Sequence, residues 1–438
     1  MSTSARHRGT PSGNRRGPAR PEVRRAPGGS RRLRTAAIVI GAALAAVLAA
    51  VAGYLVVMRA ATASSPSKPP AAGKAPAAGS AGGGAVKAHP PPGSPAGLPK
   101  LSAAQLAGQR VIYSYPGLTP PASLLRWIKE GEVGGVIFFS QNISSEAQIA
   151  SVIAELNHAN ASPRNPLRKD PLLLMTDQEG GEVRRLPGEP VLSEKQIGES
   201  ARPAAARAAG TGAAKNLAGV GMNVNLAPVL DVYRSPGDFD DQFQRSYSTD
   251  PHVVSRLGAD FVKAQQAAGV AATVKHFPGL GAAAATQNTD ERPVTLNVPL
   301  NQLRTVDEYP YRAAIAAGAK LAMVSWATYP ALDPKLPAGL STAIVGGELR
   351  QRLGFTGVTI TDALEAGALR QFGTTRNRAR MAARAGMDLI LCSAQNASQG
   401  AQARSELEKV YNAEGATAQA SFQAAVQRIL ALKTSLGR

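Results

Sequence analysis

Cysteine is almost absent from this 438-residue chain, which holds a single one, Cys392. One cysteine cannot form an intrachain disulfide, and it excludes a zinc site built on several cysteines. Histidine is also scarce, and its five residues have no HExxH or comparable spacing of metal ligands: His7, His89, His158, His252 and His276. We therefore expect neither a metal nor another cofactor.

Motifs of several other classes are missing as well. There is no GxGxxG after the first apolar run, no P-loop and no Gly-x-Ser-x-Gly elbow. Acidic residues are too few to balance the basic ones, and the formal net charge is +19. About half of this excess lies in residues 1–34, which hold ten Arg and a single acid, Glu22. Because the remainder is only moderately basic and carries no recognised nucleic-acid motif, we expect no nucleic-acid partner.

The N-terminal part of the chain divides into a tail and a long apolar run. Residues 1–34 are rich in Arg, Pro, Gly and Ser and are predicted to be a disordered basic tail. Residues 35–58 are apolar and uncharged, and a transmembrane helix needs about 20 such residues. A cleaved signal peptide is the alternative, although its apolar core usually runs only ~7–15 residues. Since basic flanks stay in the cytoplasm, we expect a single-pass plasma-membrane protein with a cytoplasmic N-terminus and an extracellular folded domain.

The rest of the chain is predicted to be a linker and one folded domain. Residues 59–98 are rich in Pro, Ala and Gly, as linkers are. In residues 99–438, helical segments alternate with eight apolar runs that begin at Arg110, Gly135, Leu172, Asn223, Ala272, Leu321, Gly357 and Asp388. This alternation predicts an α/β fold, a (β/α)8 TIM-type barrel. An open doubly wound sheet is the alternative.

Polar side chains follow five of these runs. They are Asp177 and Arg185 after the third run, Asp231 and Arg245 after the fourth, Lys275 and His276 after the fifth, Ser325 and Trp326 after the sixth, and Asp362 after the seventh. The carboxyl ends of barrel strands form one rim, where active sites lie. Carboxylates and cations bind sugar hydroxyls, and an aromatic face can stack on a pyranose. We therefore expect a carbohydrate site at this rim.

Five ordered motifs in the same region resemble glycoside hydrolase family 3. They are Asp177-Gln-Glu-Gly-Gly, Asn225-Leu-Ala-Pro-Val-Leu-Asp231, Arg245-Ser-Tyr-Ser-Thr-Asp-Pro, Lys275-His-Phe-Pro-Gly and Gly357-Val-Thr-Ile-Thr-Asp362. The resemblance covers about residues 105–395. It is to the single-domain branch of β-N-acetylhexosaminidases that process peptidoglycan sugars, and it implies a carbohydrate substrate, peptidoglycan-derived or another β-glycoside. A β-glucosidase-like enzyme of the same family is an alternative.

The resemblance also implies roles for individual residues. The family is retaining, and its nucleophile position matches Asp362, for which a helix N-cap is the alternative reading. If Lys275 lies near, it should lower the pKa of that carboxyl group. The sugar-binding positions of the family fall on Asp177, Arg185, Arg245, Lys275 and His276. We expect Glu179 and Asp231 to orient the arginines.

The loop after Lys275-His276 departs from the branch. Where the branch has a histidine early in the loop this chain has Leu280, and the Asp-His pair that supplies the acid/base falls on Thr286 and Asn288. Neither Thr nor Asn can exchange a proton near neutral pH.

Three readings of this departure remain open. Asp290 or Glu291 takes over as the acid/base, and we name Asp290 as the candidate. Alternatively, the protein is a weakened relative that binds cell-wall glycans, or an acid elsewhere, such as Glu365 or Asp333, reaches the site. A protein whose barrel is only a scaffold for partner contacts is a further alternative.

Overall fold

The computed structural model describes residues 98–413 and 415–437. The predicted basic tail, the predicted transmembrane helix at 35–58 and nearly all of the predicted linker lie outside the described residues. Among the helices that are described, none is long and apolar enough to cross a bilayer.

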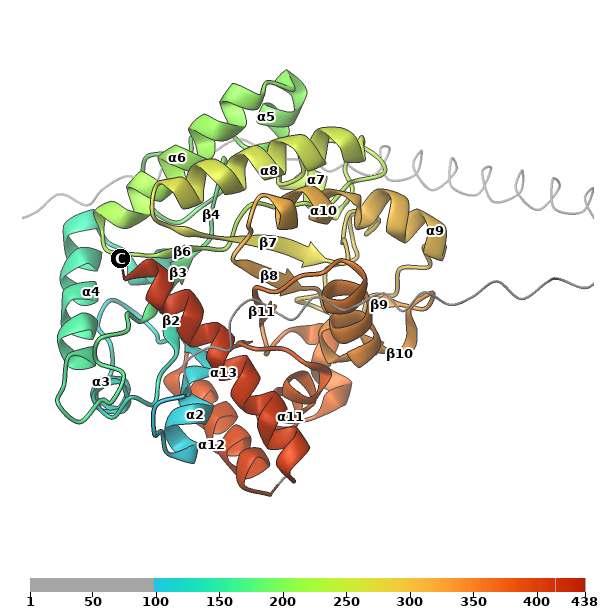
Figure 1. Ribbon diagram of the computed structural model, residues 1–438. Coiled ribbons are helices and arrows are strands. Elements are labelled where there is room, and N and C mark those ends of the chain that lie inside the picture. Colours follow the sequence, from blue (N-terminus) through green and yellow to red (C-terminus); the bar gives the residue numbers. More distant parts are fainter. Residues whose placement is uncertain (1–97, 414, 438) are drawn as a thin grey trace, which may run out of the picture. The chain divides into compact units, whose positions relative to one another are not determined.

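Eight parallel strands form a nearly closed barrel (Figure 1). They are β1 (Val111–Tyr113), β2 (Gly135–Ile137), β3 (Leu173–Thr176), β6 (Val224–Asn225), β7 (Ala271–Phe277), β8 (Leu321–Val324), β11 (Val358–Thr361) and β12 (Ile390–Leu391). Strands that follow one another in this series pair side by side, and β12 returns to pair with β1. A bridge between Ile360 and Leu389 joins the last two strands and closes the ring. The predicted (β/α)8 barrel is confirmed: seven of the eight apolar runs contain one of these strands, and the fifth lies within β7.

Alternating apolar side chains explain why these strands close into a barrel. On β3, Leu173 and Met175 belong to the cluster inside the barrel, whereas Leu172 and Leu174 belong to the cluster shared with the helices. Successive side chains of a strand point to opposite faces. A strand that is apolar on both faces is therefore buried on both, as parallel barrels require.

Helices surround the barrel and cover its outer face (Figure 1). The α-helices are α2 (Ala103–Gln109), α3 (Ala122–Lys129), α4 (Glu146–Asn160), α5 (Glu194–Ser200), α6 (Pro203–Gly219), α7 (Phe239–Gln242), α8 (Pro251–Ala267), α9 (Leu300–Gln302), α10 (Tyr309–Ala316), α11 (Thr375–Ala385), α12 (Ala397–Ala413) and α13 (Ala416–Leu436). Shorter 3-10 helices are η1 (Ser140–Asn142), η3 (Ala338–Leu340) and η5 (Gly367–Phe372), and π-helices are η2 (Leu303–Asp307) and η4 (Ala343–Arg352).

One predicted helix is divided in the structure. The sequence predicts a helix over residues 367–386, but η5 ends before Gly373, whose φ is +74°. Thr374 then caps a new helix, α11, by accepting a hydrogen bond from the backbone N–H of Asn377. A glycine with positive φ followed by a side-chain N-cap is a strong signal for a helix break.

The last helix closes the amino-terminal end of the barrel. Ile429 and Leu432 of α13 belong to the apolar cluster inside the barrel. Lys433 of the same helix is buried and donates a hydrogen bond to Gln109, which lies just before β1 (2.7 Å). Helix α13 leaves the opposite end of the barrel open, where the carboxyl ends of the strands lie. Two short hairpins rise there, β4 (Gln178–Gly180) with β5 (Val183–Arg184) and β9 (Thr328–Tyr329) with β10 (Asp333–Pro337).

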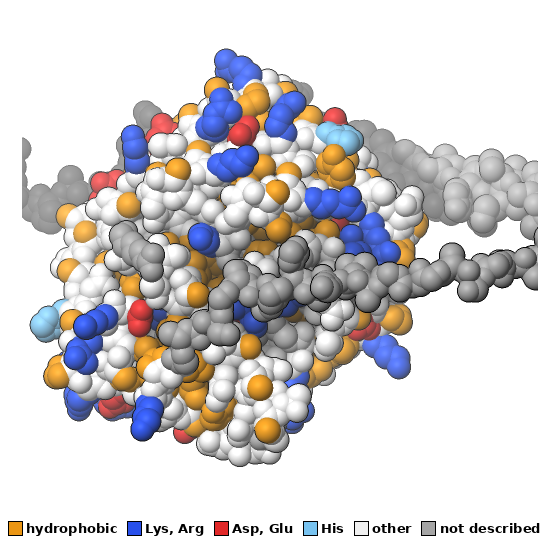
Figure 2. Space-filling view, in the orientation of Figure 1, with side chains coloured by type: hydrophobic (Ala, Val, Ile, Leu, Met, Phe, Trp, Pro, Cys, Tyr) orange, Lys and Arg blue, Asp and Glu red, His pale blue; other side chains and the backbone are white. Residues whose placement is uncertain are grey.

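The surface charge is dispersed on the face drawn in Figure 2. Lys and Arg side chains are scattered over the helices there, separated by apolar and neutral groups, and they form no continuous basic stripe on that face. The positive balance of the chain is therefore not concentrated on this side of the barrel.

Candidate active site

A cavity of about 320 Å³ opens at the carboxyl ends of the strands. Its lining includes all seven residues that the sequence singles out for the site: Asp177, Arg185, Arg245, Lys275, His276, Asp290 and Asp362. They come from the ends of β3, β7 and β11 and from the loops after β5, β6 and β7. The remaining lining is largely apolar and aromatic, as in most small-molecule sites.

The floor of the cavity is a group of two carboxylates and two cations, which we name the Lys275 cluster: Asp177, Glu179, Arg245 and Lys275. The ammonium group of Lys275 lies 2.9 Å from Asp177 Oδ1 and 2.6 Å from Glu179 Oε1. Arg245 donates two hydrogen bonds to Glu179, Nε to Oε2 at 2.8 Å and Nη2 to Oε1 at 2.9 Å. Glu179 therefore contacts an arginine, as the sequence analysis expects.

Burial and pairing act in opposite directions on the pKa values in the Lys275 cluster. Burial lowers the pKa of Lys275, but the carboxylates of Asp177 and Glu179 raise it above its ordinary value. Burial raises the pKa of Glu179, but Arg245 and Lys275 lower it to about 2. The cluster thus keeps its charges at neutral pH and presents fixed donors and acceptors to a ligand.

The β4–β5 hairpin brings Arg185 back to the cavity. Its tight turn uses Gly180 and Gly181, whose φ values are +122° and +56°. The side-chain oxygen of Gln178 then accepts hydrogen bonds from the backbone N–H groups of Arg185 and Leu186, both at 3.0 Å. The guanidinium group lies 3.9 Å from the Asp177 carboxylate. Arg185 Nε is buried and has no hydrogen-bond partner among the described residues, whereas the side chain as a whole is 30% exposed and lines the cavity.

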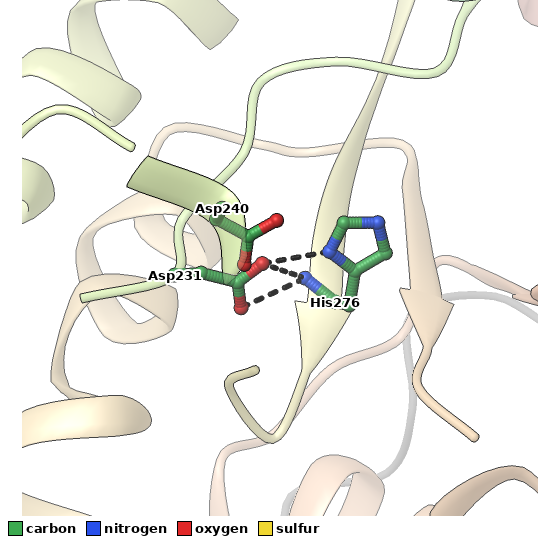
Figure 3. A group of neighbouring side chains, drawn as sticks. All are labelled: Asp231, Asp240 and His276. Carbon is green, nitrogen blue, oxygen red and sulfur yellow. Dashed lines mark hydrogen bonds and ion pairs between the residues drawn. The ribbon is translucent and has the colours of Figure 1, made fainter. Parts of the chain in front are cut away.

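His276 is held in one orientation by a buried carboxylate (Figure 3). Asp231 Oδ2 lies 2.7 Å from His276 Nδ1, and Asp231 also accepts hydrogen bonds from the backbone N–H groups of His276 and Leu280. The other ring nitrogen, Nε2, lies 3.4 Å from Arg245 Nη2. Burial and the positive charge of Arg245 lower the pKa of His276 to about 4. The ring is therefore neutral, with its proton on Nδ1, and Asp231 orients a histidine rather than an arginine.

Asp240, from α7, completes this group and was missed by the sequence analysis. It lies 3.3 Å from Arg245 Nη1 and faces the carboxyl group of Asp231 (Figure 3). Burial raises the pKa of Asp231 to about 6, and burial together with the neighbouring Asp231 raises the pKa of Asp240 to about 7. Two buried carboxyl groups side by side share a proton more readily than they ionise together.

Asp231, Asp240 and His276 also form a group whose ligand atoms are close enough together to hold a metal ion. The oxygens of Asp231 are already engaged, since they accept hydrogen bonds from two backbone N–H groups and from His276 Nδ1. The guanidinium of Arg245 supplies the positive charge next to Asp240. The donor set therefore fits a hydrogen-bonded arrangement better than a cation site.

Asp362 lies at the end of β11, half-buried in the cavity wall. Its Oδ1 accepts a hydrogen bond from the backbone N–H of Ala363 at 2.7 Å, and no helix starts directly after it, because η5 begins at Gly367. The N-cap reading therefore does not apply. Burial and the charge of Asp290 raise the pKa of Asp362. The predicted lowering by Lys275 is present but is outweighed by these two effects.

The loop between β7 and α9 carries the positions at which the chain departs from the branch. Leu280 is buried, and Asn288 lines the cavity and accepts a hydrogen bond from the backbone N–H of Asp290 (2.9 Å). Thr286 is exposed and lies outside the cavity lining. Asp290 lies exposed at the cavity rim, where desolvation by neighbouring atoms and the nearby carboxylates raise its pKa despite the lowering by Arg245.

The other candidate acids are engaged elsewhere. Glu291 is exposed and interacts with Asn288 and Arg292. Glu365 accepts hydrogen bonds from Ser393 and Gln399. Asp333, on the β9–β10 hairpin, accepts a hydrogen bond from the hydroxyl group of Ser341 (2.6 Å). Asp290 is the acid of this set that lines the cavity.

The loop is fixed to the segment that follows the candidate nucleophile. The backbone N–H of Gly367 donates to the carbonyl of Asp290 (2.7 Å), and that of Ala368 donates to Thr289 (3.0 Å). A Cβ at Gly367 would lie 2.1 Å from the carbonyl oxygen of Glu291. A glycine is therefore needed for the two loops to approach this closely, and we name these contacts the loop clamp.

Two further expectations at the rim differ from the structure. Trp326 is buried in the core, where its Nε1 donates to the carbonyl of Ala363 (2.8 Å), and Ser325 is buried beside Tyr329. The aromatic side chains at the cavity are instead Phe139, Phe239 and Phe243.

The sequence analysis also missed Glu194 of α5. This side chain accepts a hydrogen bond from the backbone N–H of Val229, and burial together with the charge of Glu179 raises its pKa.

Comparison with known proteins assigns the family. The model of the glycosyl hydrolase family 3 N terminal domain matches residues 103–432. A beta-hexosaminidase from Xylella fastidiosa is 35% identical over 291 residues, which cover 64% of this chain and 82% of that protein. The structure of a glycoside hydrolase family 3 beta-N-acetylglucosaminidase from Paenibacillus sp. str. FPU-7 is similar with a TM-score of 0.71 and 34% identity. The similarity covers 77% of this chain and 63% of that one, which is less than two thirds of its length.

A further relative bears on the predicted localisation. An uncharacterized glycosyl hydrolase from Arthroderma benhamiae is 47% identical over 332 residues, which cover 75% of this chain and 93% of that protein. That relative is named as secreted, and the described residues contain no helix that could span a bilayer. The secreted relative contradicts the predicted single-pass plasma-membrane localisation.

The matched domain extends over most of the described barrel, and the relatives and the solved structure share its family. The cavity at the carboxyl ends of the strands, with its carboxylates and cations, lies inside the matched region. The chain therefore belongs to glycosyl hydrolase family 3 and is a β-N-acetylhexosaminidase-like glycosidase of that family.

Proposed function

We propose that the protein is a retaining β-N-acetylhexosaminidase that cleaves β-linked N-acetylhexosamine from cell-wall glycans. Asp362 is the nucleophile and Asp290 is the acid/base. The observation that carries this proposal is that both carboxyl groups line one cavity above the Lys275 cluster, close enough for the charge of Asp290 to raise the pKa of Asp362. Two interacting carboxyl groups flanking a scissile bond are what a retaining glycosidase requires.

The surroundings of the two carboxyl groups support a division of roles. Burial and the charge of Asp290 raise the pKa of Asp362, whereas the N–H of Ala363 and the nearby Lys275 favour its anion. Asp290 lies near three other carboxylates, which favour its protonated form: Asp177, Glu291 and Glu365. Asp362 therefore holds the negative charge needed for attack, and Asp290 holds the proton needed by the leaving group.

The sugar to be transferred is held by the floor of the cavity. The guanidinium group of Arg185 and the carboxylate of Asp177 both line the cavity and are positioned to bind its hydroxyl groups. His276 presents a neutral ring, because burial and Arg245 lower its pKa to about 4, and Asp231 holds the ring in one orientation. These rigid partners fix the anomeric carbon relative to Asp362, so little orientational freedom remains to be lost on reaching the transition state.

The reaction then proceeds in two balanced steps. In the first, an Asp362 oxygen attacks the anomeric carbon, the glycosidic bond breaks, and Asp290 gives its proton to the departing oxygen. In the second, Asp290, now ionised, takes a proton from water, and the resulting hydroxide displaces Asp362 from the anomeric carbon. The enzyme regains a protonated Asp290 and a free Asp362 carboxylate.

The experiment compares two aryl N-acetylglucosaminides, one with a very good leaving group and one with a poor leaving group. Because protonation matters most for a poor leaving group, Asp290→Ala should lower kcat/KM for that substrate by about 10²- to 10⁴-fold and affect the good one far less. Asp362→Asn should abolish turnover of both substrates.

Glu146→Ala is the control, since Glu146 is an exposed acid on α4 that does not line the cavity. It should leave both rates within about twofold, as surface changes usually do. Equal losses for the two substrates in Asp290→Ala would remove Asp290 from the acid/base role. An unchanged rate in Asp362→Asn would remove the nucleophile assignment.

A glycan-binding relative without activity is the second candidate function. It is favoured by Asn288 and Thr286, which stand where the branch has its proton-transferring pair. In that case the wild-type protein should bind muropeptides in titration calorimetry but hydrolyse neither aryl substrate.

A further inference from the structure

Phe243 is an exposed aromatic side chain at the mouth of the cavity. It is the residue directly after α7, and 41% of it is exposed. Four other large apolar side chains of the described residues are comparably exposed, namely Leu118, Val191, Leu192 and Leu300, but Phe243 is the one among them that lines the cavity. An exposed aromatic group beside a polar binding site is a common mark of ligand contact.

The ring of Phe243 is held in place from one side. It packs edge-to-face against Phe239, with centroids 5.7 Å apart and planes at 77°. Phe239 is itself buried and lines the cavity. The chain is also held at the next residue, Gln244, whose carbonyl accepts a hydrogen bond from the backbone N–H of Lys195 (3.2 Å). Phe243 therefore presents one free surface on a fixed support rather than a mobile side chain.

The position of α7 shows which part of a substrate would meet this ring. The backbone N–H of Phe239 donates to the carbonyl of Ala283, and the side chain of Gln242 donates to Ala285, both at 2.9 Å. Residues 283–285 belong to the loop that carries Asp290. Phe243 and Asp290 thus stand on joined segments at the exposed rim, whereas the Lys275 cluster forms the buried floor.

The two levels of the cavity suit the two parts of a glycoside. Charged donors and acceptors on the floor suit the hydroxyl groups of the sugar that is transferred. The rim, where Asp290 meets the leaving oxygen, offers a hydrocarbon ring with no donor or acceptor. A pyranose ring presents C–H groups on its face, and such a face packs on an aromatic ring.

We propose that Phe243 is the platform of a leaving-group subsite that takes a second pyranose ring, so that the preferred substrates are β-linked disaccharides and longer glycans rather than glycosides of small alcohols. This inference rests on the proposed glycosidase function. It adds a specificity-determining residue, and it places the selectivity of the enzyme at the rim of the cavity.

The test uses two substrates that share the transferred sugar. N,N′-diacetylchitobiose has a pyranose leaving group, whereas N-acetylglucosaminyl fluoride has a leaving group without a ring. In the full chain, Phe243→Ala should lower kcat/KM for chitobiose by about 3- to 10-fold, in line with the loss of one aromatic stacking contact. The same variant should hydrolyse the fluoride at the wild-type rate.

Two further variants separate stacking from a general effect. Phe243→Tyr keeps the ring and should retain the wild-type rate on chitobiose within about twofold. Leu300→Ala removes an equally exposed apolar side chain outside the cavity and should change neither rate. Equal losses for chitobiose and fluoride in Phe243→Ala, or no loss for chitobiose, would overturn the proposal.

Failure of the proposed function gives a different pattern. If the wild-type protein hydrolyses neither substrate, the glycosidase proposal fails, and the subsite is then measured by calorimetry. Wild-type protein should bind chitobiose more tightly than N-acetylglucosamine, and Phe243→Ala should remove that difference. Equal affinities for the two sugars in the wild type would overturn the subsite.

Discussion

At the scale of single residues, the site depends on which carboxyl groups carry a charge. Glu179 is charged because two cations contact it, whereas Asp240 holds a proton more readily because it is buried and has Asp231 as its neighbour. His276 is neutral because it is buried and its other ring nitrogen faces Arg245. A histidine with so low a pKa cannot deliver a proton near neutral pH, so His276 does not replace the missing acid/base of the loop.

The proton held by Asp240 should make the stability of the protein depend on pH. Its pKa rises from 3.8 to about 7 on folding. A raised folded pKa gives stability that is present below the unfolded pKa and is lost as the pH rises through the folded pKa. Asp240→Asn imitates the protonated form and does not titrate. Between pH 5 and pH 8 the wild type should therefore lose on the order of 1 to 3 kcal/mol of unfolding free energy relative to this variant.

Urea unfolding at several pH values measures this difference. Glu291→Gln is the control, because that side chain is exposed, and its difference from the wild type should stay constant with pH. If the difference between Asp240→Asn and the wild type is also constant, Asp240 does not hold a proton in the folded protein.

The sequence identifies site residues better than it predicts their environment. Strand ends and motif order are local properties, and six residues selected in this way line the cavity, whereas Ser325 and Trp326, selected from their strand end, are buried away from it. Asp240 and Glu194 could not be selected, because an Asp or a Glu near a helix N-terminus is ordinary in sequence. Their burial next to other carboxylates arises from tertiary contacts. The position of Asp240, five residues before Arg245, is only a weak signal in the sequence.

At the scale of elements, the loop clamp connects the two halves of the proposed chemistry. The clamp joins the loop of Asp290 to the segment that follows β11 and Asp362. Gly367→Ala would place a methyl group 2.1 Å from the carbonyl oxygen of Glu291, so the loops must separate. A displacement of about 1 Å can cost 10²-fold in rate. We expect kcat/KM for the poor-leaving-group aryl substrate to fall by about 10- to 100-fold, and the fluoride rate to stay within about threefold.

Gly347→Ala is the control for this prediction, because nothing lies within 4 Å of the added methyl group. It should leave both rates unchanged. An equal fall of both rates in Gly367→Ala, accompanied by a lower Tm, would indicate general disruption rather than displacement of Asp290.

The regular elements were predictable and the short ones were not. Each long strand has a continuous apolar run, because it is buried on both faces. The hairpin β4–β5 consists of polar residues whose burial depends on Gln178 and Asn225, residues that meet only in the folded barrel (2.9 Å). The break of the predicted helix at Gly373 had a visible signal, a glycine followed by two threonines.

At the scale of the whole molecule, α13 completes the barrel core from its amino-terminal end. Ile429 is buried against the inner cluster, so its truncation leaves a cavity that the surrounding strands cannot fill. Ile429→Ala should lower the free energy of unfolding by about 2 to 5 kcal/mol, and Ile429→Val by about 0.5 to 1.5 kcal/mol.

Urea unfolding at pH 7 measures both variants, and the fluoride rate should remain near that of the wild type at temperatures well below the transition. If Ile429→Ala costs no more than Ile429→Val, α13 contributes little to the core and covers the barrel only loosely.

The loop clamp has a consequence for the history of the site. Its hydrogen bonds join main-chain atoms at Thr289 and Asp290 to main-chain atoms at Gly367 and Ala368. Side chains can therefore change along this loop while its path stays the same. Such a loop is an exchangeable part: a proton donor could be lost from one position and regained two residues away, while the Lys275 cluster and the proposed nucleophile remain where they are.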